Sequence, residues 1–278
     1  MSSAKKILFA GCGDLARGCM DNLLGHALTA IARRPKQLPP QVTFWQGAIT
    51  DCDLGAENWD AIVITLTPDA ANAEAYREAY WLNTQYILHS LAPTAKPLII
   101  FASSTRVYGQ NDGGWVDENS PCVPNDANGQ YLLDTETLIR QSGLPHCIVR
   151  FSGIYGPARD YVVRQVRAGQ GSGESYTNRI HRDDACGLIN FLLLRHFAGY
   201  QDPSLILASD QQPVTRSELY RWLAQQLGIT PSHVQPSADL RSGNKRCDSH
   251  RLCALGFEFR YPSYVEGYTA MLATENKM

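Results

Sequence analysis

Residues 6–16 read KILFAGCGDLA, a short apolar run that leads directly into a glycine-rich turn. Gly11, Gly13 and Ala16 form the pattern G-x-G-x-x-A, and apolar side chains at helical spacing follow it. In such a strand–turn–helix unit, the first glycine permits a tight turn, the second admits a pyrophosphate and the alanine allows close helix packing. The helix N-terminus offers free N–H groups to the anion. The stretch predicts a dinucleotide-binding turn; the alternative is a strand-to-helix turn without a ligand.

Further apolar runs alternate with helical patterns along the chain, among them a helical stretch at 70–91. The strand candidates are 6–10, 28–32, 42–47, 61–67, 97–104, 146–152 and 205–209. Strands that alternate with helices favour a parallel sheet covered on both faces. We therefore predict an α/β fold of the Rossmann type, with a doubly wound parallel sheet.

The pattern changes after about residue 211, which suggests a second region. Thr215 followed by Glu218 marks the start of an amphipathic helix. We expect the Rossmann core over 1–157 and a smaller, mostly substrate-binding region over 158–278. Within the latter, 185–209 returns to the core.

Composition excludes several classes of function. Of 278 residues, 44 % are hydrophobic and 19 % charged, and the net charge is -2, which gives no basic excess for nucleic acid. The eight cysteines form no C-x-x-C pair and the histidines show no metal-ligand spacing, so we expect no metal. No apolar run approaches the length of about 20 residues that a membrane span needs. The sequence predicts a cytoplasmic protein that does not bind membranes.

The end of the second predicted strand bears on the choice of cofactor. An NAD site would usually carry an acidic residue there, but the chain reads Ala32-Arg33-Arg34. Two guanidinium groups suit a 2′-phosphate, so we predict NADP as the preferred cofactor and NAD as the alternative. A solvated basic pair without such a role is the other interpretation.

Four motifs follow in a characteristic order: FASSTRVYG at 101–109, VRFSGIYGPAR at 149–159, NRIHRDDAC at 178–186 and ILASDQQPVT at 206–215. Together they resemble the extended short-chain dehydrogenases/reductases, the group of NAD-dependent epimerases and dehydratases. The resemblance spans most of the chain. It implies a nicotinamide cofactor at the carboxyl ends of the strands and a small polar substrate, often a nucleotide-sugar.

The resemblance also assigns residues. Ser104, four positions before Tyr108, falls on the catalytic Ser/Thr of the family. With the glycine turn and the arginines, the expected cofactor-binding residues are Gly11, Gly13, Asp14, Leu15, Ala16, Arg33, Arg34, Thr65, Thr67, Pro68 and Ser103. The expected substrate-binding residues are Tyr155, Arg159, Asn178 and His181. For Ser104, Arg159 and His181, structural roles in a strand end, a salt bridge and the core stand as alternatives.

The sequence departs from the family at the catalytic Tyr-x-x-x-Lys. If Glu136 is matched to the helical glutamate of the family, Asn128 and Leu132 take the Tyr and Lys places. If Tyr131 is used instead, Thr135 takes the Lys place. Neither register supplies a lysine, and without one a phenol stays protonated at neutral pH and is a poor base. Tyr131 is then a candidate proton donor or an aromatic packed on the helix.

Two functions remain open. The first is an NAD(P)-dependent epimerase/dehydratase-like or reductase-like protein acting on a nucleotide-sugar or other small polar substrate. The second is a catalytically impaired NAD(P)-binding sensor or partner protein, which the missing Tyr-x-x-x-Lys favours. Family members often pair through helices that correspond to 70–91 and 128–142, so the sequence allows a homodimer.

Overall fold

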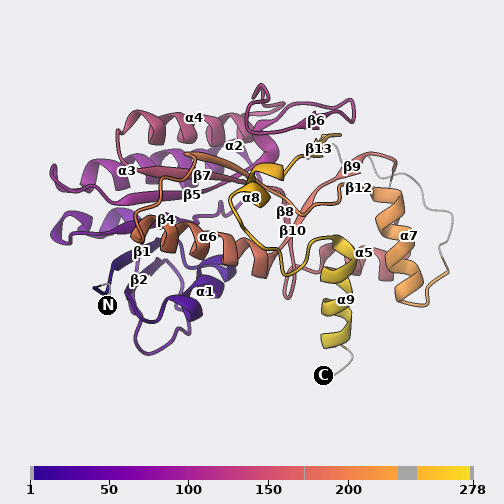
Figure 1. The fold of residues 1–278 in the computed structure, drawn as a ribbon, viewed down its shortest axis with the longest axis horizontal. Coiled ribbons are helices and arrows are strands. Elements are labelled where there is room, and N and C mark those ends of the chain that lie inside the picture. The colour runs from indigo at the N-terminus through magenta and orange to yellow at the C-terminus, as the bar shows by residue number, and fades with distance from the viewer. Residues whose placement is uncertain (1–2, 172, 231–242, 276–278) are drawn as a thin grey trace. The chain divides into compact units, whose positions relative to one another are not determined.

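The computed structural model describes residues 3–171, 173–230 and 243–275 (Figure 1). Contacts divide the chain into two compact units. Unit 1 comprises Met1–Val107, Pro124–Arg150 and Cys186–Ile206. Unit 2 comprises Tyr108–Val123, Phe151–Ala185 and Leu207–Met278. The assignment of cofactor binding to 1–157 and of substrate binding to most of 158–278 stays a prediction.

A seven-stranded parallel sheet has the order β11-β7-β5-β4-β1-β2-β3. Its strands are β1 (Lys6–Ala10), β2 (Ala27–Ala32), β3 (Thr43–Gln46), β4 (Ala61–Ile64), β5 (Leu98–Ser104), β7 (His146–Phe151) and β11 (Leu205–Ala208). Each coincides with a predicted apolar run. The central strand β4 is buried along its whole length, as is typical of parallel strands covered on both faces, whereas β3 at the edge of the sheet is only partly buried. The predicted doubly wound parallel fold is confirmed.

The strand order reverses beside β1. The chain runs outward from β1 to β2 and β3, then returns to place β4 on the other side of β1. Ligands of open α/β sheets bind at such a switch point, outside the carboxyl ends of the strands. The register pairs Ala10 with Ile31 of β2 and with Ile64 of β4, so all three strands end near the glycine turn.

Helices cover both faces of the sheet (Figure 1). One face carries α1 (Asp14–Met20) and α6 (Arg182–Phe197), joined by a 3.0 Å hydrogen bond from Asn190 Nδ2 to the Cys19 carbonyl. The other carries α2 (Ala73–Tyr76), α3 (Asn83–Ser90) and α4 (Ala127–Gln141). The predicted single helix at 70–91 is interrupted, because Arg77–Leu82 between α2 and α3 is π-helical. Such turns occur frequently at functional sites.

Unit 2 is built from short paired strands and helices. The pairs are β6 (Trp115–Val116) with β13 (Arg246–Cys247), β8 (Gly153–Tyr155) with β10 (Arg179–His181), and β9 (Tyr176–Thr177) with β12 (Val214–Thr215). The helices are α5 (Tyr161–Arg167), α7 (Arg216–Gln226), α8 (His250–Ala254) and α9 (Tyr264–Glu275). Thr215 caps α7 and forms a capping box with Glu218, as predicted.

The part of the chain that the structure describes holds no candidate membrane-spanning helix and no candidate cluster of metal ligands. None of its helices combines the length and apolar character needed to cross a bilayer. Its His, Cys, Asp and Glu side chains form no group of three that could hold a metal ion.

Candidate functional site

The glycine turn is held between the ends of β2 and β4. Gly11 has φ +93°, its N–H donates to the Ile31 carbonyl at 3.2 Å, and its carbonyl accepts from Thr65 Oγ1 at 2.7 Å. A Cβ on Gly11 would stand 2.8 Å from Leu66 N. Gly13 is different, because a Cβ there would meet no atom within 4 Å. The first glycine is required by the fold, and the second leaves space in front of the turn.

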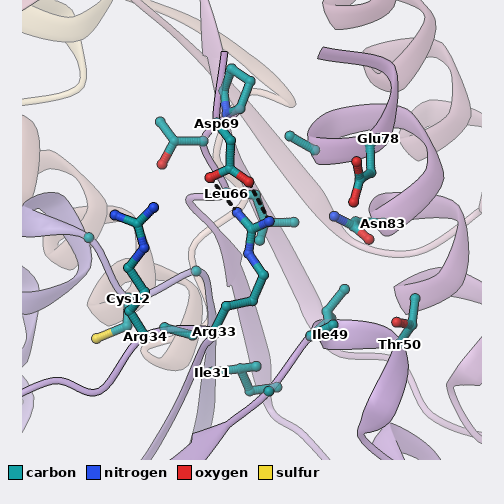
Figure 2. Close-up of a pocket in the computed structure, with 18 of the residues that line it drawn as sticks. Cys12, Ile31, Arg33, Arg34, Ile49, Thr50, Leu66, Asp69, Glu78 and Asn83 are labelled. Carbon is teal, nitrogen blue, oxygen red and sulfur yellow. Dashed lines mark hydrogen bonds and ion pairs between the residues drawn. The ribbon is translucent and has the colours of Figure 1, made fainter. Parts of the chain in front are cut away.

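This space is part of a cavity of about 420 Å³ in unit 1 (Figure 2). Its lining comes from the glycine turn, the ends of β2 and β4, the segment after β3, and α2, the π-helical turn and α3. The lining residues are Gly11, Cys12, Gly13, Ile31, Ala32, Arg33, Arg34, Lys36, Gly47, Ala48, Ile49, Thr50, Leu66, Thr67, Pro68, Asp69, Ala75, Glu78, Ala79, Leu82 and Asn83. A pocket at the switch point with a glycine turn at its floor fits a dinucleotide.

Charged side chains concentrate at one side of this cavity. Arg33 Nη1 and Nη2 donate to the two carboxylate oxygens of Asp69 at 2.5 and 2.7 Å, a fork-to-fork ion pair that Figure 2 shows. Arg34 follows on the same strand end and has no ion-pair partner among the described residues. Lys36 also lines the cavity, and Glu78 lies apart from the Arg33–Asp69 pair on the π-helical turn.

Six of the predicted cofactor-binding residues line the cavity: Gly11, Gly13, Arg33, Arg34, Thr67 and Pro68. The others have different surroundings. Leu15 and Ala16 are buried in α1, which Asp14 begins, and the Thr65 hydroxyl holds the turn. The Ser103 hydroxyl donates to Glu136 Oε1 at 2.7 Å.

Sequence reasoning missed several parts of this pocket, including the helical lining residues Ala75, Glu78, Ala79, Leu82 and Asn83. Ala48, Ile49 and Thr50 follow β3 and line the cavity, and the carboxyl end of that predicted strand was the available signal. Asp69 was also missed. Its position after Pro68 placed it near the same edge of the sheet, but nothing in the sequence indicated that it pairs with Arg33.

The end of β5 carries Ser104 and a polar cluster. Ser104 Oγ accepts a hydrogen bond from the Arg106 N–H at 3.2 Å. Arg106 Nε donates to Asp126 Oδ1 at 3.1 Å, and this carboxylate is the main cause that raises the pKa of Arg106. Arg106 Nη1 lies 3.5 Å from the Tyr76 hydroxyl, so Arg106 contacts the predicted catalytic serine through its backbone and a phenol through its side chain.

Helix α4 occupies the place of the family's Tyr-x-x-x-Lys. Asn128 and Leu132, which take these places in the glutamate register, are both buried. In the other register, the buried Thr135 donates its hydroxyl to the Tyr131 carbonyl at 2.7 Å. Neither register puts a cation beside a phenol on this helix.

Glu136 fixes α4 against the sheet. This carboxylate is fully buried and accepts from Arg150 Nε at 3.0 Å, Arg150 Nη2 at 2.6 Å and Arg140 Nη2 at 2.8 Å, in addition to the serine of β5. Charge-assisted hydrogen bonds of this kind compensate the cost of burying the carboxylate. Glu136 therefore has hydrogen-bond partners that hold it in place without the lysine of the family motif.

Two predicted substrate-binding residues, Tyr155 and His181, lie side by side in unit 2. The parallel register of β8 and β10 pairs them, and their rings meet edge to face with centroids 5.3 Å apart. Tyr155 also stacks on Tyr268 at 4.4 Å. Burial lowers the pKa of His181 to about 4, so this ring is neutral at pH 7. Both side chains are almost completely buried in this arrangement.

Asn178 and Arg159 occupy other positions in unit 2. Asn178 Nδ2 donates to the Lys245 carbonyl at 2.9 Å, and its Oδ1 accepts from the Cys247 N–H at 2.7 Å. Asn178 thus holds the strand β13 in place. The Arg159 N–H donates to the Gly156 carbonyl at 2.8 Å, which closes the turn after β8.

Comparison with known proteins shows where the chain belongs. No protein-family model matches the sequence. Protein YeeZ of Escherichia coli K12 is 33 % identical over 207 residues, 73 % of this chain and 72 % of YeeZ. A structure from Methylobacillus flagellatus, assigned as an NAD-dependent epimerase/dehydratase, is also 33 % identical, with a TM-score of 0.82. The match covers 99 % of this chain and 100 % of that one.

A more distant structure has the same fold. DesIV of Streptomyces venezuelae, a dTDP-glucose 4,6-dehydratase with NAD bound, is 22 % identical with a TM-score of 0.80, over 98 % of this chain and 97 % of DesIV. The two matches at 33 % identity, together with the four sequence motifs, show the family. The chain belongs to the NAD-dependent epimerase/dehydratase family, within the extended short-chain dehydrogenases/reductases.

Proposed function

We propose that the protein binds a nicotinamide dinucleotide, NAD(H) or NADP(H), in the cavity of unit 1. The observation that carries this proposal is the open space in front of Gly13, at the switch point of the sheet. The pyrophosphate would lie on the glycine turn. The adenosine end would lie toward Arg33, Arg34 and Ile49, where apolar and cationic groups combine. The NAD bound in the DesIV structure supports this placement by fold alone.

The proposed reaction is of the epimerase, dehydratase or reductase type on a nucleotide-sugar or another small polar substrate. When bound, the nicotinamide would supply the hydride chemistry. Ser104 would hold the substrate hydroxyl or carbonyl by a hydrogen bond, and Tyr131 would donate a proton. DesIV acts on dTDP-glucose, which supports a nucleotide-sugar as the first substrate class to try.

A catalytically impaired sensor or partner protein is the second proposed function. The observation in its favour is helix α4, where buried Asn128 and Leu132 stand in the places of Tyr and Lys. Binding of a dinucleotide is common to both functions. The two functions differ in whether the protein converts a substrate, which only the enzyme would do.

The first experiment is a fluorescence titration of the protein with NADH and with NADPH. We expect saturable binding of at least one nucleotide, and Gly13→Ala is the matched variant that reduces it. Binding of neither nucleotide would contradict the proposal. A screen of UDP- and dTDP-sugars then follows the absorbance of the bound nicotinamide and the sugar products. Tight binding with no conversion of any sugar would favour the sensor.

The preference for NADP over NAD is a finer part of the proposal. It rests on the two guanidinium groups at the end of β2, which suit a 2′-phosphate. A lower dissociation constant for NADPH than for NADH would support it. Equal or tighter binding of NADH would count against it.

Pairing of two copies through the helical segment 70–91, which contains α2, the π-helical turn and α3, and through α4 is a further part of the proposal. These helices adjoin each other on one face of the sheet, where the family often pairs. Light scattering of the purified protein tests it, and a monomeric mass at micromolar concentration would contradict it.

A further inference from the structure

We propose that Asp69 sets the cofactor specificity of this pocket by competing with a 2′-phosphate for Arg33. This inference rests on the proposed dinucleotide binding and assigns a role to a residue outside the glycine turn. It concerns the ribose end of the cofactor.

The geometry of the Arg33–Asp69 pair carries the argument. Arg33 directly follows β2 and Asp69 lies in the segment after β4, the two strands that flank β1, and both residues line the cavity. Both terminal nitrogens of Arg33 are engaged by the carboxylate, at 2.5 and 2.7 Å. A guanidinium grips a phosphate through the same fork of N–H groups. A phosphate and Asp69 therefore cannot occupy this face of Arg33 together.

The exposure of the pair makes this competition possible. The Arg33 and Asp69 side chains are 54 % and 58 % exposed, so the pair is open to water and to ligands. Exposed ion pairs are weak, and a stronger anion can displace the carboxylate. The displaced Asp69 would remain close to the phosphate and repel it. The pair thus reduces the NADP preference that the two guanidinium groups at the end of β2 would otherwise give, and it leaves the pocket open.

The same carboxylate would favour NAD. Dinucleotide sites for NAD use an acidic residue that accepts hydrogen bonds from the ribose hydroxyls. The end of β2 lacks one, since it reads Ala32-Arg33-Arg34. Asp69 brings a carboxylate to this end of the pocket from the strand on the other side of β1. Arg34, which pairs with no described carboxylate, then becomes the main ligand of a 2′-phosphate.

Asp69→Asn tests this inference, with Glu78→Gln as the matched control. Both changes remove one negative charge from the lining of the same cavity, but only the first releases Arg33. Affinities for NADPH and NADH are measured by fluorescence titration at fixed ionic strength. We expect Asp69→Asn to tighten NADPH binding by about three- to tenfold, the effect of one exposed charge-assisted contact, without tightening NADH binding. Glu78→Gln should change the ratio of the two constants by less than about twofold.

A double-mutant cycle with Arg33→Ala sharpens the test. In the wild type, Arg33→Ala should weaken NADPH binding by less than about threefold, because Asp69 already engages this side chain. In the Asp69→Asn background, the same change should weaken it by about tenfold. Thermal unfolding of each variant checks that it folds.

The outcomes separate the two proposals. An unchanged NADPH-to-NADH ratio in Asp69→Asn, with tight binding retained, would overturn the role of Asp69 and leave the dinucleotide pocket standing. An equal shift in Glu78→Gln would show a general charge effect and overturn it as well. Binding of neither nucleotide by the wild type and the variants would contradict the dinucleotide pocket and the inference with it.

Discussion

The glycine turn and the first turns of α4 belong to the same unit, yet they relate differently to the family. The turn keeps every small residue of its pattern and has open space in front of Gly13. Helix α4 keeps its buried Glu136, but neither the Asn128/Leu132 register nor the Tyr131/Thr135 register supplies the lysine of the family's proton-transferring pair. Binding by backbone groups needs only small residues and a tight turn, whereas proton transfer needs particular side chains. A family member can therefore retain a cofactor pocket after its catalytic helix has changed.

The largest effect is expected for Gly11→Val. A β-branched residue at φ +93° is strained, and its Cβ would lie 2.8 Å from Leu66 N. Strain of up to about 3 kcal/mol and overlap of similar size should destabilise the protein by up to about 6 kcal/mol and abolish dinucleotide binding. Thermal unfolding and the NADH titration measure both. Gly25→Ala, where a Cβ meets nothing within 4 Å, is the control. Dinucleotide binding retained in Gly11→Val would contradict the conclusion that the glycine turn is required for binding.

Glu136→Gln should have the next largest effect. The change keeps the shape of the side chain but leaves Arg150 buried without this carboxylate. We expect a loss of about 3 kcal/mol in the free energy of unfolding, measured by urea denaturation. Arg140→Ala removes the partner that is 36 % exposed and should cost less than about 1 kcal/mol. Equal losses in both variants would show that α4 is not anchored by the buried pair.

Leu132→Lys tests whether α4 still has room for the lysine of the family. Leu132 is 1 % exposed, so a lysine there loses apolar burial and must desolvate its ammonium group. We expect a destabilisation of about 2 kcal/mol in urea denaturation, against less than about 1.5 kcal/mol for the volume-conserving Leu132→Met. An unchanged unfolding midpoint for Leu132→Lys would mean that α4 can still accommodate a lysine, and that only the identity of this side chain has changed.

Gly13→Ala should affect stability least and binding clearly. No atom lies within 4 Å of the added Cβ, so the free energy of unfolding should change by less than about 0.5 kcal/mol. The methyl group would stand where a pyrophosphate approaches the backbone, and dinucleotide affinity should fall about tenfold. If affinity is unchanged in the titration, the pyrophosphate does not lie on this turn.

Local sequence patterns were sufficient for the sheet. Runs such as AIVI in β4 are buried on both faces and need no alternation to be recognised. The capping box at Thr215 was also predictable from a local pattern, because its two partners, Thr215 and Glu218, are three residues apart. The candidate pocket followed from the glycine turn and from the rule that strands of a parallel sheet end at one edge.

Contacts between distant parts of the chain were not predictable. Arg33 and Asp69 are 36 residues apart in the sequence. They meet because the strands that precede them, β2 and β4, lie on either side of β1 and end at the same edge of the sheet. The pairing of β6 with β13 involves two residues on each side, too few for any periodicity to appear. The π-helical turn at Arg77–Leu82 packs against α4, and no pattern in the sequence distinguished it from the rest of the predicted helix. Tertiary structure decides such features.

The cavity has a further consequence for how the protein is made. All its lining residues lie between Gly11 and Asn83, so they leave the ribosome long before β13, which unit 2 needs to pair with β6. Contacts close in sequence form quickly, whereas distant pairings wait for the whole chain. The segments of unit 1 are complete once Ile206 has been made, so a nascent chain could hold a nucleotide, as proposed, before β13 is synthesised. A bound nucleotide would then stabilise an early folding intermediate as well as the finished protein.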